Sequence, residues 1–117
     1  MKIFDCTLYY DEDLILDARL NILDKYIDKF IICEATFTHS GRKKKLNFNI
    51  EKFSKFKDKI IYIIQDSEPK DIIYDDISKR IENPINWRAN AVKRISHQRN
   101  KLLEEVNKHA DMNDFIL

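Results

Sequence analysis

The chain has 117 residues, of which 44% are hydrophobic, and its 21 Lys and Arg nearly balance its 20 Asp and Glu. A globular chain of this length can bury roughly two-thirds of its unfolded surface, so we expect one domain, or part of one, and not a disordered chain. The formal net charge of +1 supplies no general attraction for nucleic acid or for an anionic membrane. The single glycine excludes glycine-rich phosphate loops.

The first half of the chain alternates between strand and helix patterns. Residues 2–8 are mostly apolar or β-prone and predict a strand, and the acids at 11–13 are typical of a helix start. Leu16, Leu20, Leu23 and Ile27 then recur at the spacing of an amphipathic helix. The continuous apolar run 30–33 predicts a strand that is covered on both faces, as in a parallel sheet.

The second half begins with a polar loop over 36–45, which contains the only glycine. Ile50, Phe53 and Phe56 predict a short helix, and the run 60–64 predicts a second buried strand. Residues 66–86 contain two prolines and little periodicity, so we expect a long connection with at most one helical turn. Residues 87–110 predict a long helix, and 114–117 have the composition of a short strand.

This alternating order predicts an α/β fold with a mostly parallel sheet flanked by helices. Ligands of such sheets bind beyond the carboxyl ends of the strands. Two cysteines stand apart without metal spacing, and no two of the three histidines lie four residues apart, so we expect no zinc site. No run approaches the roughly 20 apolar residues of a membrane span, and no signal-peptide pattern opens the chain. We therefore expect a cytoplasmic protein.

Arg99 is the most informative residue in the predicted long helix. On a helical wheel it falls within the apolar stripe formed by Val92, Ile95, Leu102 and Val106. A buried guanidinium needs a carboxylate, phosphate or carbonyl partner, and its fork matches a phosphate. Arg99 therefore either contacts a ligand phosphate or pairs with an internal acid such as Glu34.

Further candidates follow the predicted second strand. Glu34 stands at its carboxyl end, where it could accept hydrogen bonds from a sugar or a base, although a lone carboxylate there can equally serve as a cap or an ion-pair partner. Thr38, His39, Ser40 and Gly41 crowd polar groups into one loop after this strand. The loop is suited to substrate contact, but loops are polar in general. No residue pattern pairs a nucleophile with a base.

Several segments together resemble glycosyltransferase family 17. They are Lys2 to Cys6, Asp11 to Leu20, Phe30 to Ala35, Thr38-His39-Ser40-Gly41, Trp87-Arg88 and Gln98-Arg99-Asn100. The resemblance spans essentially the whole chain. It implies a GT-A-like fold, of which residues 1–117 would form the N-terminal half that binds the nucleotide-sugar.

The resemblance also implies an activity, a cofactor and site residues. The family transfers a sugar, here expected to be N-acetylglucosamine, from a UDP-sugar donor to a hydroxyl of an acceptor glycan. By resemblance, Arg99, Asn100 and Glu34 would bind the donor, and residues 38–41 would form the loop at the pocket mouth. Mn²⁺ or Mg²⁺ is expected on an Asp-x-Asp motif, which together with the catalytic residues would follow Leu117. We therefore expect residues 1–117 to hold no metal and to be inactive alone.

Two other readings remain. A non-catalytic α/β interaction or regulatory module would use Arg99 in an internal ion pair. A nucleotidyltransferase would share the sheet, the phosphate ligands and the metal, but it is disfavoured because residues 7–13 contain no glycine-rich loop.

Overall fold

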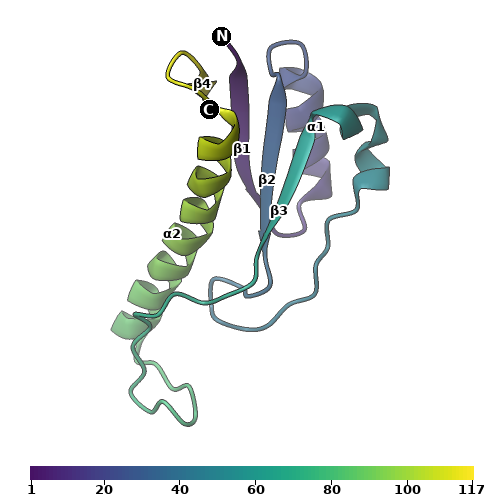
Figure 1. Ribbon diagram of the computed structural model, residues 1–117. Coiled ribbons are helices and arrows are strands. Elements are labelled where there is room, and N and C mark those ends of the chain that lie inside the picture. The colour runs from purple at the N-terminus through teal and green to yellow at the C-terminus, as the bar shows by residue number, and fades with distance from the viewer.

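The computed structural model describes residues 1–117 and contains a four-stranded sheet in the order β3-β2-β1-β4, with every neighbouring pair parallel (Figure 1). In chain order the elements are β1 (Ile3–Tyr9), α1 (Asp13–Leu23), β2 (Lys29–Ala35), the 3₁₀ segment η1 (Ile50–Lys59), β3 (Ile60–Gln65), α2 (Pro84–His109) and β4 (Phe115–Ile116). The predicted α/β class and parallel sheet are confirmed. None of the helices is both long and apolar enough to cross a membrane.

The sheet is covered on both faces, as the apolar run 30–33 predicts. Phe30 and Ile32 pack into a cluster on the face covered by α1 and η1, whereas Ile31 and Cys33 pack against α2 on the other face (Figure 1). All four side chains are at most 1% exposed. Side chains alternate between the faces of a strand, so an uninterrupted apolar run supplies both clusters at once.

The long helix begins earlier than the sequence predicts. Pro84 is the first residue of α2, and the side chain of Asn83 accepts a 2.8 Å hydrogen bond from the backbone N–H of Asn86. Proline is well tolerated at the first helical position, because its missing N–H would have no partner there. The Asn83-Pro84 pair is therefore a helix start, and the preceding connection contains no helix.

The predicted buried face of α2 is wrong for Val92 and Arg99, whereas Leu102 and Val106 are buried as predicted. The buried residues of α2 recur every fourth position, and they are Asn90, Arg94, Gln98, Leu102 and Val106. Val92 is 62% exposed, and Arg99 is exposed as well. The reason is visible in Figure 1: the second half of α2 lies on the sheet, whereas its first half extends past the carboxyl edge and meets polar loops.

The predicted final strand is confirmed as β4. Phe115 pairs with Ile3, and Leu117 extends the ladder by accepting a 3.0 Å hydrogen bond from the N–H of Cys6. The side chains of Phe115, Ile116 and Leu117 remain more than half exposed.

Candidate functional site

A cavity of about 160 Å³ lies at the carboxyl ends of β1 and β2, where ligands of parallel sheets bind. Its lining combines aromatic and apolar groups with polar side chains, namely Leu8, Tyr9, Tyr10, Glu12, Ala35, Phe37, Thr38, His39, Lys44 and Gln98. We call it the strand-end cavity. Apolar walls with a few polar groups are typical of sites for small organic ligands.

Glu34 is the penultimate residue of β2, next to the cavity-lining Ala35, but its carboxylate already has internal partners. It is fully buried and accepts hydrogen bonds from Lys44 Nζ at 2.6 Å, from the N–H groups of Asn47 and Phe48 at 2.6 and 3.0 Å, and from Tyr62 Oη at 2.7 Å. Burial acts to raise the pKa of Glu34, but these donors outweigh it and hold the pKa below its ordinary value. Glu34 therefore anchors residues 44–48 to the sheet. This is the role of an ion-pair partner that the sequence left open for it.

Residues Thr38 to Arg42 form a tight turn beside the cavity. The N–H of Thr38 donates to the carbonyl of Arg42 at 2.7 Å, and the N–H of Gly41 donates to the carbonyl of Thr38 at 2.9 Å. Gly41 has a φ of +90°, a conformation that L side chains rarely adopt. Thr38 and His39 line the strand-end cavity, as expected for a pocket loop, whereas Ser40 and Gly41 line a different cleft.

Gln98 connects this turn to the sheet. Its Nε2 donates to the carbonyl of Cys33 at 2.8 Å, and its Oε1 lies 3.1 Å from Nε2 of His39. An amide oxygen can only accept, so Nε2 of His39 carries the proton and donates it to Oε1 of Gln98. This hydrogen bond fixes the orientation of the imidazole ring. The side chain of Gln98 is 3% exposed and forms part of the cavity wall.

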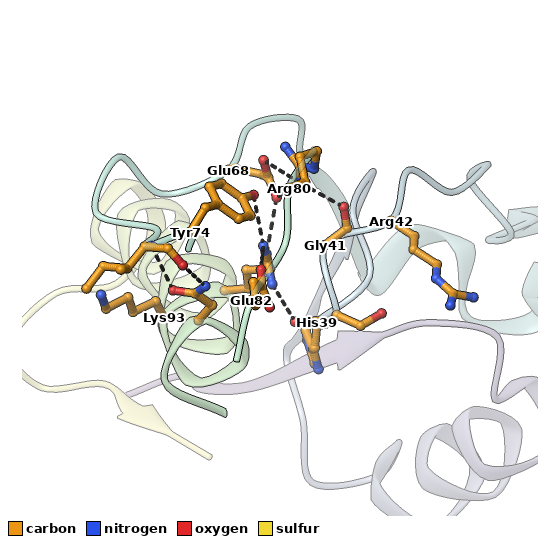
Figure 2. A network of polar contacts seen from close by, with 12 residues as sticks. His39, Gly41, Arg42, Glu68, Tyr74, Arg80, Glu82 and Lys93 are labelled. Atoms are coloured by element: carbon orange, nitrogen blue, oxygen red, sulfur yellow. Dashed lines mark hydrogen bonds and ion pairs between the residues drawn. The ribbon is translucent and has the colours of Figure 1, made fainter. Parts of the chain in front are cut away.

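Arg94, and not Arg99, is the buried arginine of α2. Its guanidinium contacts Glu68 at 3.1 Å, the carbonyl of His39 at 3.1 Å and Glu82 at 3.4 Å. Figure 2 shows the groups that converge here, with His39 and Gly41 from the turn and Glu68, Tyr74, Arg80 and Glu82 from the connection 66–83. Arg94 thus joins the turn to the long connection with internal partners alone.

The structure brings only some of the expected donor-binding residues together. The side chain of Arg99 makes no hydrogen bond or ion pair and lines neither the strand-end cavity nor the cleft beside Ser40. Asn100 is also exposed and faces an open groove beside Lys70 and Lys93. The expected place of Arg99 in a buried stripe is therefore wrong, whereas residues 38–39 do lie at a cavity.

Two residues of the site were missed, Arg94 and Gln98. A signal for both was present, because extending the Leu102–Val106 line backwards in steps of four gives 98, 94 and 90. A search for apolar residues alone passes over this line. The structure shows no group of three or more His, Cys, Asp or Glu side chains that could hold a metal ion. The expected Mn²⁺ or Mg²⁺ belongs to a motif after Leu117, so its binding stays a prediction.

Comparison with known proteins adds one match. No curated protein and no solved structure is similar enough to be recognised. The family model described as "Glycosyltransferase family 17" matches residues 1–116, essentially the whole length. The match agrees with the parallel α/β sheet and with a cavity at its carboxyl edge. The chain belongs to glycosyltransferase family 17.

Proposed function

We propose that this chain provides the donor-binding part of a transferase that moves N-acetylglucosamine from UDP-N-acetylglucosamine to a hydroxyl of an acceptor glycan. Family membership supplies the sugar donor and the acceptor as partner classes. The observation that carries the proposal is the strand-end cavity, which lies at the carboxyl ends of the two central strands.

The cavity is suited to the nucleoside end of the donor. Tyr10 and Phe37 offer aromatic surfaces on which a base can stack, and Tyr10 is 47% exposed. The ring of His39 and the carboxylate of Glu12 lie among the same lining residues, where they could hydrogen-bond a uracil edge or ribose hydroxyls. At about 160 Å³ the cavity is smaller than typical ligand pockets, so it would hold the base or ribose and leave the diphosphate outside.

In the proposed reaction the bond between the anomeric carbon and the diphosphate oxygen breaks, UDP leaves, and the acceptor oxygen bonds to that carbon as its proton departs. We assign this chain binding and orientation, because the hydroxyl–imidazole pair that it contains, Ser67 Oγ with His97 Nε2 at 3.0 Å, does not line the strand-end cavity. A divalent cation that neutralises the leaving diphosphate stays a prediction, and we assign no step to it. Cytoplasmic action likewise stays a prediction.

The test is calorimetric titration of the 117-residue chain with UDP-N-acetylglucosamine, UDP and GDP, each with and without Mn²⁺. We expect both uridine nucleotides to bind more tightly than GDP. Tyr10→Ala and Phe37→Ala should each weaken binding at least about fivefold, because stacking on a base contributes roughly 1–3 kcal/mol.

Tyr26→Ala is the matched control, because Tyr26 is an exposed tyrosine just after α1 that lines neither the strand-end cavity nor the cleft beside Ser40. This variant should bind UDP-N-acetylglucosamine like the parent chain. A folded chain that binds none of the nucleotides would contradict the proposal and favour the non-catalytic interaction module.

A further inference from the structure

A second cleft, of about 360 Å³, lies on the other side of the Thr38–Arg42 turn. It is more open than the strand-end cavity and is lined by Ser40, Gly41, Arg42, Tyr74, Arg80, Glu82 and Trp87. We call it the tryptophan cleft. Thr38 and His39 face one cavity while Ser40 and Gly41 face the other, so one short turn is the wall between them.

Trp87 gives the cleft an aromatic surface that the core does not use. It is the only tryptophan in the chain and is 48% exposed. It lies in the first turn of α2, where the Asn83 cap and Pro84 fix the helix start. A half-exposed indole in a cleft provides a stacking surface for a ring-shaped ligand at little cost in side-chain entropy.

The cleft and the network beneath it carry one unbalanced positive charge. Arg80 lies 3.0 Å from Glu68 and stacks over the Tyr74 ring, and Arg94 lies between Glu68 and Glu82. These two arginines and two glutamates balance. Arg42 makes no side-chain hydrogen bond or ion pair, and in Figure 2 its side chain points away from the network.

We propose that the tryptophan cleft binds a saccharide that carries a carboxylate or a phosphate. The sugar ring stacks on Trp87, Glu82 accepts from its hydroxyls, and Arg42 binds the anionic group through its guanidinium fork. Under the proposed function this saccharide is the acceptor, and that assignment rests on the donor occupying the strand-end cavity. The shared turn then places the two substrates side by side.

Arg94 and Gly41 hold the turn in position. The guanidinium of Arg94 donates to the carbonyl of His39, and Arg80 donates to the carbonyl of Gly41 at 3.1 Å. A Cβ on Gly41 would lie 2.5 Å from Nη2 of Arg94, so only glycine permits this approach. The turn is therefore fixed from the side of the network, and Arg42 follows it directly.

The test uses the fluorescence of Trp87, which reports on this cleft alone because the chain has no other tryptophan. The full chain is titrated with a glucuronate-containing disaccharide, with N-acetylglucosamine 1-phosphate, with neutral chitobiose and with inorganic phosphate. We expect one or both anionic saccharides to shift the emission and to bind at least about tenfold more tightly than chitobiose. Arg42→Gln should remove this preference, and Arg88→Gln, an exposed arginine next to Trp87, should keep it.

Calorimetry of Trp87→Phe and Trp87→Ala follows the loss of stacking, and thermal unfolding shows that each variant is folded. We expect both to bind the donor like the parent chain and the saccharide more weakly, with Phe the milder change. Three results would overturn the inference: no saccharide response while UDP-N-acetylglucosamine still binds, displacement of the saccharide from Trp87 by UDP, or inorganic phosphate binding as tightly as the saccharides. The first of these results would overturn the inference but not the proposed function. Failure of the parent chain to bind UDP-N-acetylglucosamine would refute the proposed function separately.

Discussion

The carboxylate of Glu34 shows how a residue that looks functional in the sequence can be structural. It forms a buried ion pair with Lys44, whose side chain is 9% exposed, and three further donors complete its hydrogen bonding. A buried charge with this many partners is tightly held. Its role is therefore to fasten the segment that forms one side of the strand-end cavity.

Replacing this carboxylate should be costly. Glu34→Gln leaves the ammonium of Lys44 buried without its counter-charge, which costs about 3–5 kcal/mol of unfolding free energy. Urea unfolding at neutral pH measures this loss. The double variant Glu34→Gln with Lys44→Met should recover part of it, because no unpaired charge remains; equal stabilities of the parent chain and Glu34→Gln would refute the role.

The same pair predicts a pH dependence. The folded-state pKa of Glu34 lies below its ordinary value of 4.5, because the hydrogen bonds outweigh the effect of burial. Its stabilising contribution is therefore complete above pH 4.5 and is lost as the pH falls through the folded-state pKa. The stability difference between the parent chain and Glu34→Gln should narrow in acid, and urea unfolding at a series of pH values measures it.

Gly41 is the second residue whose replacement should lower the unfolding free energy for a specific reason. Gly41→Ala would place a side chain at a φ of +90° and a Cβ 2.5 Å from a guanidinium that several partners hold. The left-handed backbone alone costs about 1–2 kcal/mol, so we expect at least this loss in thermal or urea unfolding. Ser40→Ala, which removes one exposed hydrogen bond to Thr38, should cost less than about 1 kcal/mol.

At the scale of elements, α2 changes character along its length. Leu102 and Val106 pack on the sheet with Phe4 and Ile31, as an amphipathic helix should. Asn90 instead bonds both backbone groups of Ile73, donating to its carbonyl at 2.7 Å and accepting from its N–H at 3.0 Å. The buried residues thus form one line along α2, but the residues at its start are polar and those at its end are apolar. The start of the helix meets polar loops, whereas the end meets the sheet.

This assignment of the α2 face is directly testable. Leu102→Ala should lower the unfolding free energy by about 2–5 kcal/mol, because it removes buried side-chain volume between helix and sheet. Arg99→Ala should change it by no more than about 0.5 kcal/mol, since that side chain is exposed and unpaired. Urea unfolding of the two variants measures both values, and a large loss for Arg99→Ala would restore the stripe predicted from the sequence.

At the scale of the whole molecule, protection of the backbone against local opening should decrease outward from the two central strands. β1 and β2 pair on both sides, whereas β3 and β4 are edges and residues 66–83 contain neither helix nor extended strand. Amide hydrogen exchange should therefore be slowest in β1 and β2 and fastest in 66–83. Exchange in β2 as rapid as in the long connection would contradict this packing.

Much of the architecture could be predicted because it depends on local patterns. The apolar run 30–33 identified a strand with two covered faces, and the four-residue spacing of Leu16 and Leu20 identified α1. The candidate site was predicted only in part. The turn at 38–41 was placed beside a cavity, but the buried arginine was assigned to position 99 because an apolar stripe was assumed to run the full length of the helix.

The sequence by itself determined the α/β class and the strands, since these follow from short-range periodicity and from the order of the segments along the chain. It also determined the family, through the resemblance of particular segments and the family model that matches residues 1–116. Only the tertiary structure decided which polar groups are buried together. Glu34 meets Lys44, and Arg94 meets Glu68 and Glu82, across turns whose course depends on packing. A buried charge is stable wherever the fold supplies its partner, and a pattern within one helix holds no information about that partner.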